Sequence, residues 1–332
     1  MRCRSGSPAG PAEAMSTQHS IVEAPARSEP QPGNQPRLTR WARMRQNGAF
    51  YTSVSPFFLL FAIFGAFPIV ASLLVSFVKW DGLSDPEFVG LQNYAILFED
   101  PVFRTAIWNT VYIWVGSTLL TMTVAFGLAY LISEYVLVGR GFFRVVFLFP
   151  LLVAPAVTGI IASVMFSSHS GIVNAFLSFV SGERVIFDWT DSPVWIKPLI
   201  ILLLTWRWTG WHLIIFMAGL QAVPRELYSA ARVDGAGEWQ VFFRITLPLM
   251  IPFILYSAIS STVGAFQLFD EPYVLTNGTY GTGNSAQVLG TYLYQSAFQD
   301  FRFGLASATS YVIFALILVF SAINIRTLRR QV

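Results

Sequence analysis

Charged residues are scarce in this chain of 332 residues. Asp, Glu, Lys and Arg together make up 12% of it, and hydrophobic residues make up 54%. A typical soluble domain has about 25% charged residues. The apolar residues also come in blocks of twenty or more, the length that crosses the hydrocarbon core of a bilayer. The composition therefore indicates an integral membrane protein and disfavours a soluble one.

Reactive and metal-binding residues are also few. The single cysteine, Cys3, has no partner for a disulfide or a zinc site. Neither lysine, Lys79 or Lys197, is followed by Ser or Thr, so the phosphate-binding pattern Gly-x-x-x-x-Gly-Lys-Ser/Thr is missing. The three histidines are widely spaced, which disfavours a membrane-embedded enzyme. We expect no metal site, catalytic residue or cofactor here, and no nucleic-acid partner because no basic patch interleaves with aromatic residues.

Residues 1–50 lack apolar periodicity. They are rich in Pro, Ser, Gly, Gln and Arg, a composition that cannot bury enough surface to fold, so we predict a disordered cytoplasmic tail. A targeting peptide is the alternative. The first apolar run begins only near Pro56 and is too long for the core of a secretory signal, so we expect no cleavage. Met15 is a second candidate start of the chain.

Residues 51–332 contain six apolar runs, each long enough to cross as a helix. Because lipid offers the backbone no hydrogen-bond partners, such runs must be helical. We predict an all-α fold, a polytopic helical membrane protein with six transmembrane helices and a cytoplasmic coupling-helix loop. The predicted spans are about 56–78, 108–132, 145–166, 198–220, 250–269 and 304–325, and the loop is 221–249.

The distribution of Lys and Arg between the spans predicts the orientation. Fifteen lie in the tail, the second and fourth connections and the C-terminus, and five lie in the other connections. Basic residues favour the cytoplasmic side, so we expect both termini to face the cytoplasm. The three external loops, 79–107, 167–197 and 270–303, are long enough to form an outward docking surface. Short interfacial helices without a partner are the alternative.

The connection between spans four and five has the pattern of two short helices joined by a turn. Pro224 suits the start of the first helix and Glu226 complements its positive end. A turn is expected at 234–237, which reads Asp-Gly-Ala-Gly. The second helix is predicted over 238–247, ending before Pro248. An ordinary interfacial hairpin would explain the helices and their charge, but not the full pattern of residues.

That pattern resembles the cytoplasmic EAA loop of binding-protein-dependent ABC importer permeases. The match is the run Glu-Leu-Tyr-Ser-Ala-Ala-Arg-Val-Asp-Gly-Ala at 226–236, followed by Ile-Thr-Leu-Pro at 245–248. Further segments resemble the carbohydrate-type subfamily. They are Phe-Val-Gly-Leu-Gln-Asn-Tyr at 88–94, Gly-Arg-Gly-Phe-Phe-Arg at 139–144, Gly-Leu-Gln-Ala-Val-Pro at 219–224 and Thr-Asn-Gly at 276–278. The resemblance covers nearly everything from residue 50 onward.

The resemblance implies a subunit of the bacterial inner membrane that is not itself an enzyme. Its partners would be a second permease subunit, a cytoplasmic ATPase dimer that carries ATP and Mg, an external solute-binding protein, and membrane lipid. The chain departs from the family at Ser229, where an acidic residue is usual, so Glu226 or Asp234 would have to carry more of the docking. The residues expected to couple to the ATPase are Glu226, Ser229, Ala230, Ala231, Asp234, Gly235 and Pro248.

Span four carries an arginine at membrane depth. An ionisable residue there costs roughly 2.5–3.5 kcal/mol on insertion scales and needs a reason. One interpretation places Arg207, Trp208 and Trp211 along a solute pathway. The other lets Arg207 snorkel or pair with an acidic loop residue while the tryptophans form an interfacial belt. His212 has the character of a satisfied interior histidine more than that of a proton relay.

The end of span five supplies two further candidates. Gln267 and Asp270 are candidates for the same pathway. The alternative is that Asp270 and Glu271 cap the span at the outer surface, and this is the prediction for Glu271. The solute stays open, because Arg207 suits an anionic sugar and the aromatic residues suit a neutral one. The competing function is a secondary transporter driven by an ion gradient. That class usually shows carboxylates within spans and inverted repeats, and neither is evident here.

Overall fold

The structure is a computed structural model that describes residues 48–134 and 139–329, and it divides into two units. The described part of the first unit, residues 48–62, consists mainly of helix α2 (Gly48–Phe61). The predicted tail, with Cys3 and the basic residues up to Arg45, lies outside the described residues. The π-helical turn η1 (Ala62–Ala66) follows α2, and all later elements belong to the second unit.

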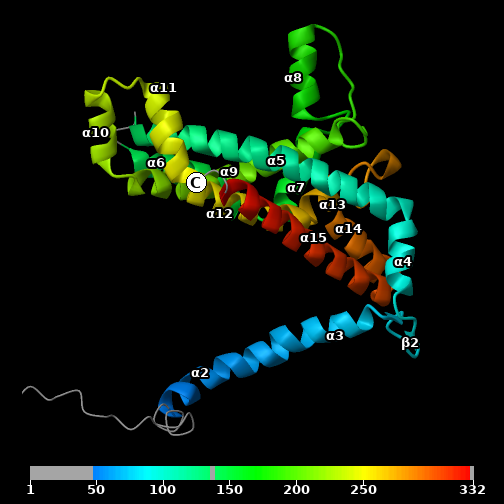
Figure 1. Cartoon of the computed structure of the whole chain (residues 1–332). Helices are drawn as coiled ribbons and strands as arrows, with labels where there is room; N and C mark the ends of the chain where they lie inside the picture. Colours follow the sequence, from blue (N-terminus) through cyan, green and yellow to red (C-terminus); the bar gives the residue numbers. More distant parts are fainter. Residues whose placement is uncertain (1–47, 135–138, 330–332) are drawn as a thin grey trace, which may run out of the picture. The chain divides into compact units, whose positions relative to one another are not determined.

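The second unit is almost entirely helical (Figure 1). Its elements in chain order are α3 (Phe67–Val75), β1 (Val78–Lys79), β2 (Glu87–Phe88), α4 (Gln92–Glu99), α5 (Pro101–Glu134), α6 (Arg140–Leu152), α7 (Pro155–Met165), α8 (Ile172–Ser181), α9 (Ile196–Ala222), α10 (Arg225–Val233), α11 (Glu238–Val241), the π-helical turn η2 (Phe242–Thr246), α12 (Leu247–Phe266), α13 (Asp270–Leu275), the 3-10 turn η3 (Thr282–Asn284), α14 (Leu289–Tyr294), the π-helical turn η4 (Gln295–Gln299) and α15 (Phe303–Arg329). The strands form one antiparallel pair, in which Val78 faces Phe88 and Lys79 faces Glu87.

Within the described residues, five helical stretches are long and apolar enough to cross a bilayer. They are Thr52–Val75, Pro101–Glu134, Ile196–Ala222, Glu238–Phe266 and Phe303–Thr327, and the bent pair of α6 and α7 makes a sixth if it counts as one span. These segments correspond to the six predicted spans. The structure therefore has the predicted class, a polytopic helical membrane protein.

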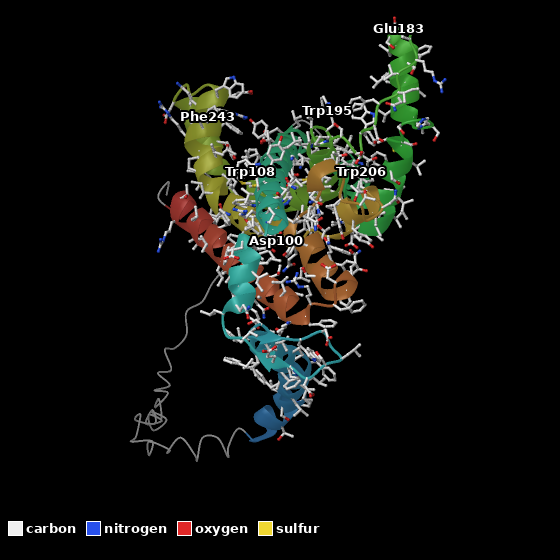
Figure 2. The ribbon with its side chains drawn as sticks, turned by 90° about the vertical axis from the view of Figure 1, so that its right-hand side faces the viewer. Asp100, Trp108, Glu183, Trp195, Trp206 and Phe243 are labelled. Atoms are coloured by element: carbon white, nitrogen blue, oxygen red, sulfur yellow. The ribbon has the colours of Figure 1, made fainter. Side chains whose placement is uncertain are left out.

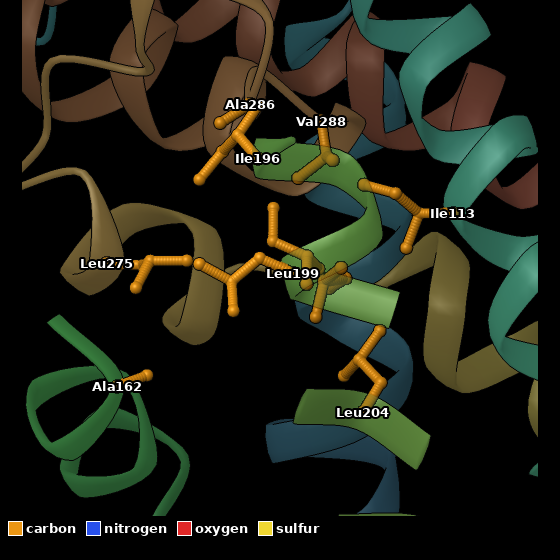
Figure 3. Close-up of a cluster of buried hydrophobic side chains, with 10 residues drawn as sticks. Ile113, Ala162, Ile196, Leu199, Leu204, Leu275, Ala286 and Val288 are labelled. Carbon is orange, nitrogen blue, oxygen red and sulfur yellow. The ribbon is translucent and has the colours of Figure 1, made fainter. Parts of the chain in front are cut away.

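Helix α9 forms the centre of the second unit. It packs along α5 and also against α6 and α12. One apolar cluster joins Ile113 of α5 and Ala162 of α7 to the first turns of α9, together with Leu275 and Val288 (Figure 3). A second cluster, around Phe216 of α9, joins α5 and α12 farther along. Residues from segments that are distant in sequence thus meet on one central helix.

The predicted span 145–166 consists of two helices with a sharp bend between them. Helices α6 and α7 meet at an angle of 89°. Val153 and Ala154 between them have extended backbone angles, with ψ of 130° and 140°. Pro155 is the physical reason, because a proline disfavours the helical conformation of the residue before it and has no N–H to donate.

The connection between α9 and α12 forms the predicted helix, turn and helix at one end of the bundle, away from α4 (Figure 1). The second helix does not end before Pro248, however. Helix α11 continues through η2 into α12, so that 238–266 is a single helical stretch. The π-helical turn explains the continuity. The Leu247 N–H donates to the Phe242 carbonyl five residues back, so the helix is already widened where Pro248 lacks a donor.

The predicted external loops all contain local structure. Residues 79–107 include β2 and α4, and 270–303 include α13, η3, α14 and η4. Residues 167–197 form an arm in which α8 projects from the bundle, with Glu183 near its tip (Figure 2). Both the loop and the start of α9 carry tryptophans, and Trp189 packs edge-on against Phe187 and Trp195. Docking of an outer partner to these loops stays a prediction.

Candidate functional site

A cavity of about 320 Å³ lies between α5, α9 and α12. Its wall is completed by Pro155 at the start of α7 and by the chain segment that links α12 to α13. This volume is in the range of small-molecule sites. The polar side chains in its wall are Ser117, Thr121, Arg207, His212, Ser260, Ser261, Gln267, Asp270 and Glu271. Such a concentration of polar groups inside apolar helices marks a functional site in a membrane protein.

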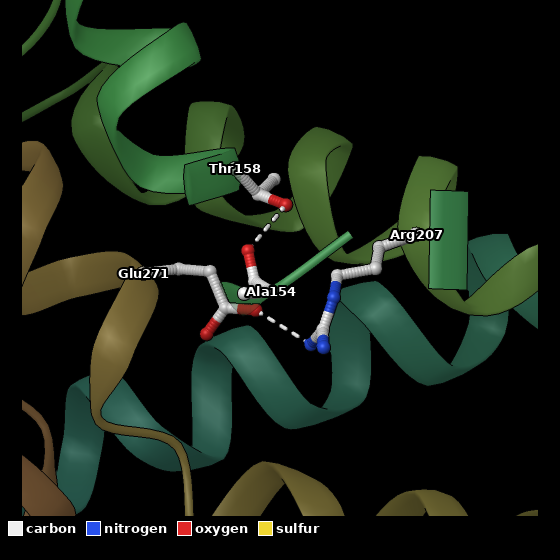
Figure 4. A network of polar contacts seen from close by, with 4 residues as sticks. All are labelled: Ala154, Thr158, Arg207 and Glu271. Carbon is white, nitrogen blue, oxygen red and sulfur yellow. Dashed lines mark hydrogen bonds and ion pairs between the residues drawn. The ribbon is translucent and has the colours of Figure 1, made fainter. Parts of the chain in front are cut away.

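Arg207 forms a buried ion pair with Glu271 in the wall of this cavity (Figure 4). Its Nη1 lies 3.0 Å from Glu271 Oε1, and the residues are 9% and 3% exposed. Arg207 thus lines the cavity and is also paired with an acidic residue, as one interpretation expected, whereas its place on a solute pathway stays a prediction. The prediction that Glu271 caps the span at the outer surface was wrong.

The chain reversal after α12 explains the position of Glu271. Helix α12 ends at Phe266, and α13 then packs against α7. Because of this packing, the first residues of α13, Asp270 and Glu271, lie in the cavity wall. Carboxylates in a first helical turn are favoured by the positive end of the backbone dipole. The Glu271 carbonyl oxygen also lies 3.6 Å from the position that a Cβ on Gly159 of α7 would take.

The two predicted tryptophans differ in their positions. Trp208 lines the cavity, and the Arg207 guanidinium lies 5.4 Å from its ring centre. Trp211 is 37% exposed and is not among the residues of the described cavity wall, so its place on a solute pathway stays a prediction. Trp206 and Trp108 are likewise exposed (Figure 2), in keeping with apolar surface turned to lipid.

Two buried nitrogens in the cavity wall have no hydrogen-bond partner among the described residues. They are Nε of Arg207 and Nδ1 of His212. His212 is an interior residue as predicted, with an exposed fraction of 2%, but the expectation that the fold satisfies it does not hold for Nδ1. Unpaired buried polar atoms are costly, and at a cavity they are groups that a ligand or water can satisfy.

The hydroxyl groups of the wall were not predicted. Ser117 and Thr121 lie one turn apart on α5, and Ser260 and Ser261 are adjacent on α12. Ser261 Oγ and Thr118 Oγ1 are 2.8 Å apart, and this contact joins the two helices. Gln267 and Asp270, which were predicted, do lie in the wall, and the structure brings them together with Arg207 and Trp208.

A second site is the exposed helical hairpin at the end of the bundle. Helix α10 has no buried residue. Six of the predicted coupling residues, Glu226 to Gly235, lie on α10 and the turn after it, whereas Pro248 lies in the first turn of α12. Tyr228 Oη and Thr246 Oγ1 are 3.2 Å apart and fasten α10 to η2. Trp239, 76% exposed, stacks on Phe243 beside the turn.

The comparisons with known proteins give consistent results. Residues 135–329 match the family described as "Binding-protein-dependent transport system inner membrane component". The lactose transport system permease protein LacF of Rhizobium radiobacter is 35% identical, over 84% of this chain and 93% of that protein. The arabinooligosaccharides transport system permease protein AraP of Bacillus subtilis is 33% identical, over 85% of this chain and 88% of that protein.

Solved structures agree with the sequence relatives. A bacterial ABC transporter involved in the import of the acidic polysaccharide alginate has a chain that superposes with a TM-score of 0.76 at 25% identity. The match covers 87% of this chain and 98% of that one. A second structure of a bacterial alginate ABC transporter, in complex with an alginate pentasaccharide-bound periplasmic protein, gives the same score and identity.

Proposed function

The chain belongs to the family of binding-protein-dependent transport system inner membrane components, and we propose that the cavity between α5, α9 and α12 is its half of a passage for a sugar or sugar-like solute. The chain is a multi-pass membrane protein and a permease subunit of an ABC importer. It is not itself an enzyme, because ATP hydrolysis in this family belongs to a separate subunit.

The chemistry of the cavity wall supports a hydroxylated solute. Hydroxyl groups on α5 and α12 line the same cavity as the unpaired nitrogens of Arg207 and His212, and the Trp208 ring adds apolar surface. Sugars present both features, hydroxyl groups in the plane of the ring and C–H groups on its faces, and sites with a few convergent polar groups in an apolar wall suit them. The names of LacF and AraP refer to a disaccharide and to oligosaccharides, which agrees with this class.

As a member of a binding-protein-dependent family, the chain works with a solute-binding protein. The proposal adds a second permease subunit and a cytoplasmic ATPase dimer. A second subunit would close the cavity and share with lipid the exposed apolar surface, which includes Phe64 and Phe67 at 76% and 69% exposure.

The ATPase would dock on the hairpin of α10 and α11. This hairpin lies at the end of the bundle opposite α4 (Figure 1) and presents exposed Glu226, Ser229 and Asp234. The contact between the Tyr228 and Thr246 hydroxyl groups links α10 to the residue that precedes α12. Helix α12 lines the cavity farther along its length. A movement of α10 would therefore be passed to the cavity wall through one continuous helical stretch, 238–266.

Purification and transport together test this function. A tagged chain isolated from its native membrane in mild detergent should bring down a second permease and an ATPase. In proteoliposomes the complex should take up solute, in the presence of the external binding protein, only with ATP and Mg. A secondary transporter would instead accumulate solute with an ion gradient and without ATP, and ionophores would abolish that uptake. Uptake that needs an ion gradient and no ATP would refute the proposal.

A further inference from the structure

The geometry points to an electronegative cavity that selects against anionic solutes, with Asp270 as the residue that sets this preference. The inference rests on the proposed function, since it concerns which sugars pass through the same cavity. The sequence left open whether Arg207, a cation at membrane depth, binds an acidic sugar, and the inference concerns this point.

The charge of Arg207 is balanced within the cavity wall. Its Nη1 is 3.0 Å from a Glu271 oxygen, both residues are buried, and the Trp208 ring lies against the guanidinium. The Glu271 carboxylate therefore neutralises the positive charge within the wall. The guanidinium has five N–H donors, and the described contact with Glu271 is made through Nη1, so other N–H groups remain to donate to a hydroxyl oxygen.

Asp270 is the remaining charge. It lines the cavity, it is half-buried, and no hydrogen bond or ion pair holds its carboxylate within residues 48–134 and 139–329. Among the described residues, the wall contains one cation, Arg207, which pairs with Glu271, and Asp270 adds a carboxylate that no cation in the wall balances. A carboxylate, sulfonate or phosphate on a solute would meet like charge in a site of reduced dielectric, which discriminates strongly between otherwise similar ligands.

Charged thiol reagents measure this potential without knowledge of the natural solute. The chain has a single cysteine, Cys3, so a Cys3→Ser background is free of thiols. Ser260→Cys places one thiol in the cavity wall, and Ser181→Cys places one at the exposed last residue of α8, shortly before the oppositely charged pair Glu183 and Arg184. The cationic and anionic methanethiosulfonates, of similar size, are then applied to the complex purified with its own partners.

We expect the ratio of cationic to anionic modification rates to be about tenfold higher at residue 260 than at residue 181. Asp270→Asn should remove most of that difference. Asp85→Asn, the same substitution at an exposed outer position, should leave it unchanged. The inference would be overturned by equal rate ratios at residues 260 and 181, or by a ratio at residue 260 that Asp270→Asn does not change. Neither outcome would contradict the proposed transport function. A thiol at residue 260 that reacts with neither reagent would overturn the inference and also the assignment of this cavity to the solute passage.

Matched sugars extend the test to solutes. Equilibrium binding of radiolabelled cellobiose and cellobiouronic acid to the same complex, without the external binding protein, compares two ligands that differ by one carboxylate. The neutral sugar should bind at least several-fold more tightly, and Asp270→Asn should narrow the difference. Tighter binding of the uronic acid would contradict the inference.

Discussion

Arg207 and Glu271 stabilise the fold only as a pair. Each is buried among apolar helices, and each would carry a large desolvation cost alone. The Coulomb attraction across 3.0 Å offsets that cost, so the net contribution of the intact pair to the free energy of unfolding is small. Its importance for the site lies in fixing the first turn of α13 against the middle of α9.

Breaking the pair from one side is the first prediction. Glu271→Gln leaves a buried guanidinium without a counter-charge, which should cost about 3–5 kcal/mol. The double variant Arg207→Met with Glu271→Leu removes both charges and should stay within about 1 kcal/mol of the wild type. The midpoint of thermal unfolding of the purified complex, followed by size-exclusion chromatography of heated samples, checks this. A single variant as stable as the double variant would contradict it.

Gly235 offers a second residue-scale prediction. Its φ is +76°, whereas that of Gly237 is −70°, and no atom lies within 4 Å of where a Cβ would be at either position. The two glycines therefore differ in backbone conformation and not in available space. Gly235→Val should strain the turn by about 1–2 kcal/mol and reduce ATP-dependent uptake several-fold by displacing the end of α10. Gly237→Val is the matched control.

Uptake in proteoliposomes and the amount of copurified ATPase are the measurements for this pair of variants. If both variants transport equally well, the turn conformation has no part in coupling. If both fail equally, bulk at the hairpin surface is the cause instead of the backbone strain at Gly235.

The sequence predicted the charged residues of the site better than its hydroxyl groups. Arg207 and Asp270 were found because charge is costly in an apolar run. Ser117, Thr121, Ser260 and Ser261 gave no such signal, because hydroxyls are tolerated in membrane helices by bonding to the carbonyl four residues back. Glu271 was misplaced because a residue near the end of a span ordinarily faces water. Only the packing of α13 on α7 turns it inward.

At the scale of elements, α6 and α9 approach closely at a glycine. A Cβ on Gly210 would lie 2.1 Å from the Phe147 carbonyl oxygen, and the close backbone contact exists because no side chain is present. Gly210→Ala should therefore separate α6 from α9 and destabilise the fold by about 1–3 kcal/mol.

Gly127→Ala is the control for that substitution, since no atom lies within 4 Å of its Cβ position on α5. It should be neutral or slightly stabilising, because alanine is the better helix former. The thermal midpoints of the two variants, each in the purified complex, give the comparison. Equal midpoints would show that α6 adjusts to the added methyl group.

Helix boundaries were predictable where apolar length decided them. The predicted span 198–220 lies within α9 and the predicted span 304–325 lies within α15, because lipid requires a continuous helix there. The effects of prolines were harder to predict. Pro155 divides a predicted span into two helices, whereas the helix that was predicted to end before Pro248 continues past it. Each outcome depends on backbone hydrogen bonds that neighbouring segments supply or replace.

At the scale of the whole molecule, the orientation in the membrane is the remaining prediction. With Cys3→Ser as background, Ser229→Cys on α10 should be shielded from a membrane-impermeant maleimide in intact spheroplasts and labelled after lysis. Ser181→Cys at the end of α8 should be labelled without lysis. The reverse pattern would place the hairpin outside and remove the basis for ATPase docking.

The break between α6 and α7 has a consequence for how the protein is made. Their lengths are 13 and 11 residues, and each is far short of the roughly 20 residues that hold a helix across a bilayer. Their packing partners, α9 and α13, lie later in the chain. When the bent segment is first inserted, these packing partners have not yet been synthesised. We therefore expect it to stay beside the translocon until the ribosome has added α9 and α13, so that the final packing of this permease forms late in its synthesis.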